Sequence, residues 1–335
     1  MTTERAGTEV GRSSGIDFMK GVLVEVMVLF HAINYFLGAT HVALKYLDFV
    51  TGSFIFISGY LITGKVPKAG SEDVARAKRI AVRGVKLVVL FFCLNIMVNM
   101  MLSSNYNKRT FGVGLFFENV MEIFIKGKKY HAIFEILLPI AYLQLMGAIF
   151  QRLSWRCRPV MYLSVSIAVG MCVIYSNGIT FLYFFLGVGL CGMTAGCVAL
   201  RERLKSSKNW IIMSISCVFI YFLLITGLKS NFSIYLFGIL SLLSLIHYGE
   251  LVCKKSSRLH AMTISLGQYS LLSYLSQILF LQVLFRLPLL AKDSVGSSLL
   301  AILLTNVFLV GLIRAMVEIR KHSPGVNRTY LWIFS

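Results

Sequence analysis

Ten long apolar segments fill most of this chain, and they constrain its fold more than any other feature. They lie near residues 18–39, 47–64, 84–103, 131–151, 159–175, 180–200, 209–228, 232–252, 264–288 and 297–317. Each is long enough to cross the roughly 30 Å hydrocarbon core of a bilayer as a helix. None shows the alternation of apolar and polar residues that marks the strands of a membrane barrel. The segments therefore predict an all-α, polytopic membrane helix bundle with about ten transmembrane helices.

The composition is that of a protein whose solvent is largely lipid. Of the 335 residues, 57% are hydrophobic and 14% are charged, whereas soluble domains have roughly 25% charged residues. A soluble fold could not cover so much apolar surface, so the lipid bilayer is the first partner that the sequence implies. A net charge of +19 would suggest nucleic acid in a soluble protein. In this chain the excess of Lys and Arg is explained by basic residues in loops, which orient membrane helices. No nucleic-acid partner is predicted.

The distribution of Lys and Arg predicts the orientation of the helices. With the N-terminus inside, 24 of the 33 basic residues fall on the inner side, so the positive-inside rule places both termini in the cytoplasm. We expect a transmembrane domain over 1–320, a short polar cytoplasmic tail over 321–335 and insertion in the cell membrane. The predicted outer loop 104–130 is basic, against this rule. Its segment 111–125 is too short and charged to span, which favours an interfacial or re-entrant piece.

The spacing of cysteine and histidine predicts no metal site. The seven cysteines follow no ligand or redox spacing, and most lie inside apolar segments, where cysteine acts as a small hydrophobic residue. Four of the histidines lie at segment ends or in loops without ligand spacing: His41, His247, His260 and His322.

The first apolar segment holds the densest set of ionisable side chains, and such side chains inside a membrane are functional candidates. Lys20 and His31 are eleven residues apart, close to three helical turns, so they share one helix face about 16 Å apart along the axis. Lys20 would bind an anionic ligand at the cytoplasmic boundary, and His31 would react with the far end of that ligand. Asn34 lies on the same helix face. The alternative is structural, with Lys20 reaching to the interface and His31 bonded to a neighbouring helix.

Two stretches near the N-terminus resemble the transmembrane acyltransferase family 3. Residues Ile16–Gly21, followed by His31, resemble the family's opening, in which an Asp and an Arg precede a His. Phe54–Ile62 is similar to the family's second-helix pattern of phenylalanines ending in Ser-Gly-Phe-Leu. Heparan-glucosaminide acetyltransferase-like and glucan succinyltransferase branches share much of this layout.

Two further stretches carry the same resemblance. Arg79 and Arg83 match a basic run before the third helix, and Leu266–Leu275 resembles a late Leu-Gly-x-x-Ser pattern followed by Tyr-Leu. The sequence departs from the family at two positions. Lys20 stands where an Arg is usual, which keeps the charge but loses the forked hydrogen bonding. Gln277 stands where many members carry a His, which puts any role of a second histidine in doubt.

The resemblance implies an O-acyltransferase that moves an acyl group, usually acetyl, from cytoplasmic acetyl-CoA or another acyl-CoA to a hydroxyl of a cell-surface or lipid-linked glycan. His31 would be the general base, because the ordinary imidazole pKa of about 6.5 lies near working pH; a transient acyl-His is the alternative. Donor-binding residues would be Lys20, Arg79, Arg83 and Ser58, with packing as the alternative role of Ser58. Acceptor-binding residues would be Asn34, His131 and Glu135, with an interfacial position as the alternative for His131.

Two other functions compete with this interpretation. A ten-helix transporter of the drug/metabolite kind fits the length and helix count equally well. Such carriers usually derive from two repeats, and the two halves of this sequence show no similarity. A non-catalytic membrane scaffold is the third hypothesis, and under it the loss of the His31 imidazole would have no effect.

Overall fold

The computed structural model describes eleven stretches of the chain: residues 14–38, 40–63, 72–103, 113–126, 134–151, 160–167, 181–197, 216, 219–221, 258–286 and 294–334. Within these stretches the chain forms helices and no strand, as the all-α prediction requires. The predicted segments 209–228 and 232–252 lie outside them except for residues 216 and 219–221, and so does His131.

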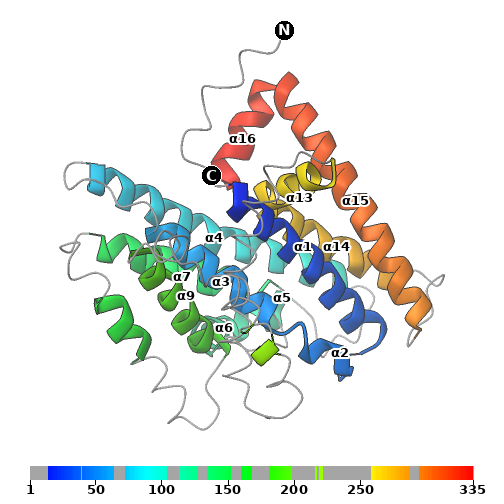
Figure 1. The fold of residues 1–335 in the computed structure, drawn as a ribbon, viewed down its shortest axis with the longest axis horizontal. Coiled ribbons are helices and arrows are strands. Elements are labelled where there is room, and N and C mark those ends of the chain that lie inside the picture. The colour runs from blue at the N-terminus through cyan, green and yellow to red at the C-terminus, as the bar shows by residue number, and fades with distance from the viewer. Residues whose placement is uncertain are drawn as a thin grey trace. The chain divides into compact units, whose positions relative to one another are not determined.

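The chain forms two compact units, of which the first joins residues 1–50 to residues 208–335. Its helices come from both ends of the sequence and lie side by side (Figure 1). They are α1 (Ser14–Phe36), α2 (Val42–Lys45), α13 (Arg258–Gln268), α14 (Ser270–Arg286), α15 (Val295–His322) and α16 (Pro324–Phe334). Helix α1 therefore packs against helices that follow it by more than 200 residues, which makes this unit dependent on long-range contacts.

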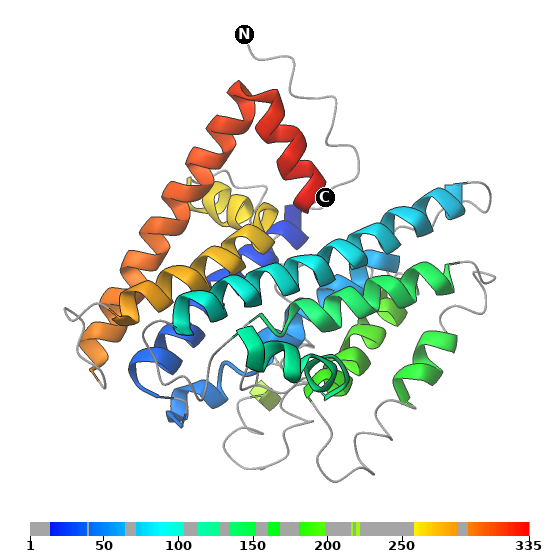
Figure 2. The ribbon, with the colours of Figure 1, turned by 180° about the vertical axis from the view of Figure 1, so that it is seen from behind.

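The second unit covers residues 51–207. Its helices are α3 (Phe49–Thr63, whose first two residues belong to the first unit), α4 (Glu72–Ser103), α5 (Val113–Glu118), α6 (Val120–Lys126), α7 (Leu137–Phe150) and α9 (Phe181–Cys197). Residues 160–167 are also helical. Helices α4 and α7 run side by side (Figure 2). The segment 111–125, predicted to be too short to span, holds the two short helices α5 and α6.

Within the described residues, three helices are long and apolar enough to cross a membrane: Val42–Thr63, Val74–Met100 and Val295–His322. A fourth span is formed if α13 and α14 cross together as one bent element. Helix α1, which carries Asp17, Lys20, Glu25 and His31, is not among the three. The helices thus agree with a protein that spans a membrane.

The predicted segment 264–288 is not one helix but two. Helices α13 and α14 meet at Tyr269 with a bend of 89°. Gly267 lies two residues before this corner, where its lack of a side chain lowers the preference for helix. The Tyr269 hydroxyl accepts a hydrogen bond of 2.8 Å from the Arg320 guanidinium of α15, so a contact distant in sequence fixes the corner.

The segment 321–335, predicted as a short polar tail, is helical from Pro324 to Phe334. Proline is favoured at the first position of a helix because it has no N–H group to leave unpaired. The Arg320 Nε atom donates to the Asn327 side chain at 2.9 Å, and the guanidinium lies 4.2 Å from the centre of the Tyr330 ring. Arg320 thereby ties α16 to the corner between α13 and α14.

Helix α4 begins earlier than its predicted apolar segment 84–103, at Glu72. The stretch from Ala75 to Arg83 contains alanine, arginine and lysine, which are strong helix formers, and neither Pro nor Gly. The basic residues expected in a loop therefore stand on the first turns of a helix. One of them, Arg76, donates a hydrogen bond of 2.8 Å to the carbonyl of Ile62 and satisfies an open group at the end of α3.

Close backbone contact joins α1 to α13. A Cβ atom at Gly21 would overlap the carbonyl oxygen of Thr263, and one at Gly267 would overlap the carbonyl oxygen of Asp17. Small residues allow such contact between membrane helices, where van der Waals packing rather than exclusion of water drives association. The glycines of two sequence stretches that resemble the acyltransferase family are thus packed against each other.

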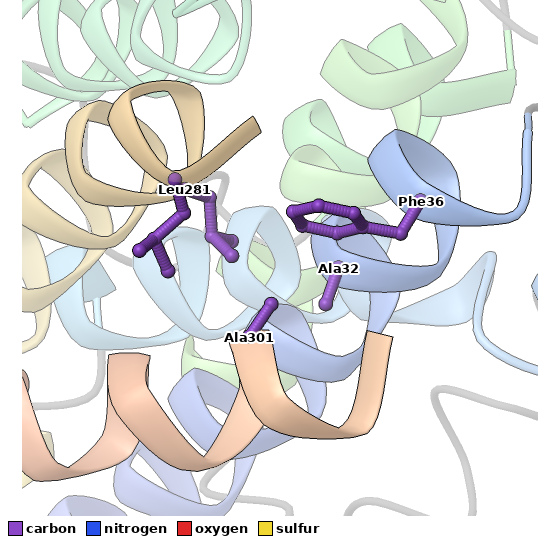
Figure 3. Packing of buried hydrophobic residues seen from close by; sticks show 5 residues of the cluster. Ala32, Phe36, Leu281 and Ala301 are labelled. Carbon is purple, nitrogen blue, oxygen red and sulfur yellow. The ribbon is translucent and has the colours of Figure 1, made fainter. Parts of the chain in front are cut away.

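An apolar cluster packs against the C-terminal end of α1. Ala32 and Phe36 of α1, Leu281 and Leu284 of α14, and Ala301 of α15 form its buried members (Figure 3). Gly267 is beside Asp17 and Gly21 near the start of α1, whereas the rings of Phe285 and Phe36 are 5.7 Å apart near its end. Helices α1 and α14 therefore run in the same direction.

We predict that Gly267→Ala lowers the stability of the protein, because its new methyl group has no space beside the Asp17 backbone. Overpacking of this kind typically costs about 1–3 kcal/mol. Gly311→Ala in α15 is the matched control, since nothing lies within 4 Å of its Cβ position and Ala favours helix. Thermal unfolding in detergent should show a lower Tm for Gly267→Ala alone. Equal Tm values for the two variants would contradict the packing described.

Candidate functional site

Lys20 is held by an ion pair on its own helix. Its ammonium lies 3.0 Å from the Asp17 carboxylate, and the exposed fractions of the two side chains are 15% and 4%. The spacing of three residues places both side chains on one face of α1. The pairing explains how a lysine is accommodated in a mostly buried position, because an unpaired charge there would be costly. Asp17 thus fixes the position of the Lys20 side chain.

His31 lies three turns further along the same unbroken helix. Its ring is flanked by Phe30, with the ring centres 5.4 Å apart, and by Tyr35, with the centres 6.4 Å apart. The Nε2 atom is buried and has no hydrogen-bond partner within the described part of the chain. Among the described residues, none bonds this atom to a neighbouring helix.

Tyr35 lies one turn beyond His31, and sequence reasoning missed it. Its hydroxyl accepts a hydrogen bond of 3.2 Å from the Gln282 amide of α14. Two further polar residues of α14, Ser273 and Gln277, are fully buried and were not assigned a role from the sequence. The spacing of four residues between His31 and Tyr35, and between Ser273 and Gln277, is the signal that could have found them.

The predicted donor-binding residues Arg79, Arg83 and Ser58 belong to the second unit. Arg79 and Arg83 are both exposed and one turn apart on α4, so their guanidinium groups project from one helix face. The Ser58 hydroxyl donates a hydrogen bond of 2.8 Å to the carbonyl of Phe54 in its own helix. Beside it, Gly59 packs against the backbone of Gly189 in α9, so packing accounts for this stretch of α3.

The predicted acceptor-binding residues are spread over different parts of the chain. Asn34 is half-buried on α1, three residues beyond His31. Glu135 is half-buried in the turn before α7, in the second unit. His131 lies outside the described residues. Among the residues that are described, no group of three His, Cys, Asp or Glu side chains could hold a metal ion.

Helix α1 thus combines two groups that could serve one reaction. A neutralised but polar Asp17–Lys20 pair marks one end, and an imidazole with an open, buried nitrogen lies about 16 Å away along the axis. An imidazole whose nitrogen is not engaged is able to accept a proton from a substrate. The fold and these groups define a helical membrane protein with a candidate acid–base residue inside its first helix.

A comparison with protein families gives the particular class. The model of an acyltransferase domain, that of acyltransferase family 3, matches residues 13–315. The chain belongs to this family and is an acyltransferase, which favours the enzyme over the transporter and the scaffold. The match includes the stretches with Asp17, His31 and Gly267. Searches of curated proteins and of solved structures found no significant match.

We predict that Asp17→Asn and Lys20→Met each destabilise the protein, while the double variant loses less than the sum. Removing one partner leaves the other charge mostly buried and unpaired, at a cost of about 3–5 kcal/mol. Residues in direct contact typically show interaction energies of about 0.5–3 kcal/mol in such a cycle. Chemical unfolding of the unaltered protein, the two single variants and the double variant in detergent measures this interaction energy. Additive losses would show that the two side chains do not depend on each other.

Proposed function

We propose that this acyltransferase moves an acetyl or related acyl group from cytoplasmic acyl-CoA to a hydroxyl of a cell-surface or lipid-linked glycan. The observation that carries the proposal is the open Nε2 atom of His31, buried on the same helix as the Asp17–Lys20 pair. Membership of the acyltransferase family supplies the reaction class. The identity of the donor and of the acceptor follows from the resemblance of the N-terminal stretch.

His31 acts as the general base in this proposal. Its imidazole removes the proton of the acceptor hydroxyl as the oxygen attacks the thioester carbonyl. The tetrahedral intermediate collapses, the carbon–sulfur bond breaks, and the imidazolium returns the proton to the departing thiolate. The products are the acylated hydroxyl and free CoA, so no other reactant is needed. An acyl-His intermediate would instead give ping-pong kinetics.

The remaining predicted residues act in binding. Lys20, Arg79 and Arg83 bind the phosphate groups of the donor, with Arg79 and Arg83 supplying forked hydrogen bonds from adjacent turns of α4. Ser58 can accept a hydrogen bond from acyl-CoA as it stands, and it can donate one only if its hydroxyl leaves the Phe54 carbonyl. Acceptor contacts are assigned to Asn34, His131 and Glu135.

The proposed topology has about ten spans over residues 1–320, both termini in the cytoplasm and insertion in the cell membrane. The excess of basic residues on the predicted inner side supports it. The three spanning helices and the bent pair α13–α14 are part of this arrangement. It places the basic start of α4 on the side where acyl-CoA is made.

We predict that His31→Ala abolishes acylation of the acceptor while the protein stays folded and inserted. Loss of a general base typically lowers the rate about 100- to 10,000-fold. His41→Asn is the control, because His41 is exposed and caps α2 through its side chain, a role that Asn also fills. Mass spectrometry of surface glycans and release of the CoA thiol are the two readouts. Full activity of His31→Ala would refute the role of the base.

We also predict that a fluorescent protein fused after Ser335 is fluorescent in a bacterial host, while alkaline phosphatase at the same point is inactive. Alkaline phosphatase inserted in the 104–130 loop should be active, because that loop faces outward in the proposed topology. The opposite pattern would reverse the orientation and move the Lys20 end of α1 away from the cytoplasm.

A further inference from the structure

Two side chains of α14 are buried in an unusual state. Ser273 and Gln277 have no exposed surface. Within the described stretches, the Ser273 hydroxyl and both the nitrogen and the oxygen of the Gln277 amide lack a hydrogen-bond partner. Burial without a partner costs free energy, because the hydrogen bonds lost to water are not replaced. Such groups therefore call for a physical explanation, and a role in function is one of those that apply.

Two other polar side chains in the same unit are paired. Gln282, five residues beyond Gln277 on α14, donates to the Tyr35 hydroxyl. Thr305 of α15 is also fully buried, and its hydroxyl donates 2.7 Å to the carbonyl of Ala301. Among the described residues of this unit, the unpaired amide and hydroxyl lie on one face of α14, and the unpaired His31 Nε2 atom lies on α1.

The open groups lie near the level of His31. Helices α1 and α14 run in the same direction, and Gln282 meets Tyr35 across them. Gln277 lies about 7.5 Å before Gln282 along α14, and His31 lies about 6 Å before Tyr35 along α1. The two are therefore within about one helical turn of the same level, and Ser273 lies one turn nearer to the corner at Tyr269.

The chemistry of an open primary amide limits what it can bind. It offers N–H donors and a carbonyl acceptor, so it can donate to the carbonyl of a secondary amide or accept from its N–H group. The pantetheine arm of acyl-CoA contains secondary amides, one of them separated from the sulfur by a short ethylene link. If His31 acts beside the thioester, a side chain at its level would meet that amide.

We propose that Gln277, with Ser273 a turn away, binds an amide of the pantetheine arm and so positions the thioester beside His31. This inference rests on the proposed function, because it takes acyl-CoA as the donor. Gln277 would be a binding residue rather than an acid or base, and it would contribute to recognition of the arm rather than of the nucleotide.

Binding of two probes to the purified full chain in nanodiscs tests the proposal. The probes are acetyl-CoA and adenosine 3′,5′-bisphosphate, which has the nucleoside and two of the three phosphate groups of CoA but no arm. We expect Gln277→Leu to raise the Kd of acetyl-CoA about tenfold, equal to about 1.4 kcal/mol, and to leave that of the bisphosphate unchanged. Ser273→Ala should give a smaller change in the same direction. The control is Gln268→Leu, since Gln268 is exposed at the end of α13.

Thermal unfolding adds a readout that separates binding from structure. Gln277→Leu removes an unpaired buried amide at similar volume, so the Tm without ligand should stay equal or rise. A lower Tm would mean that the amide is structural and would overturn the proposal. If Gln277→Leu cannot be purified, Gln277→Asn can replace it. Its side chain is shorter by one methylene group, so it should also weaken the binding of acetyl-CoA.

The results also separate this inference from the proposed function. If the unaltered protein binds no acetyl-CoA, the donor assignment fails and the inference fails with it. If that protein binds acetyl-CoA and Gln277→Leu binds it as tightly as Gln268→Leu does, only the inference is overturned. An equal loss of affinity for both probes would place Gln277 at the nucleotide and would also overturn it.

Discussion

At Gly21 and Gly267 the backbones of α1 and α13 touch with no side chain between them. In a membrane, helices associate through close packing rather than through release of water, so such contacts have a large structural effect. This contact brings the N-terminal helix against a segment that follows it by more than 200 residues. It also places the Asp17 backbone at the contact and thereby sets the position of the Asp17–Lys20 ion pair.

The corner at Tyr269 determines how the chain continues beyond this contact. Helix α13 crosses the start of α1, and the bend of 89° then lets α14 run alongside α1 to the apolar cluster at Phe36. Arg320 holds the corner through the Tyr269 hydroxyl and holds α16 through Asn327. Substitution of Arg320 would remove both contacts at once, because they share one guanidinium.

Polar side chains inside the first unit are of two kinds. Most are paired, as Lys20 is with Asp17 and Tyr35 is with Gln282. His31, Ser273 and Gln277 have buried atoms without a partner in the described chain. In an apolar bundle the first kind stabilises the fold, and the second kind is retained at a cost to stability. The proposed reaction would need a ring nitrogen of the second kind, because a nitrogen that already accepts a hydrogen bond within the protein is not free to take up a substrate proton.

The sequence determined the class of this protein, because apolar segments of spanning length exclude a water-soluble fold and short motifs carry the family. It also placed Lys20 and His31 on one helix, since helical periodicity is a local property. Only the tertiary structure decided that the segment 264–288 breaks at Tyr269, that Gly267 meets Asp17, and that Ser273 and Gln277 have no partner among the residues that the structure describes. Those features depend on which helices become neighbours, and neighbours hundreds of residues apart leave no trace in local periodicity.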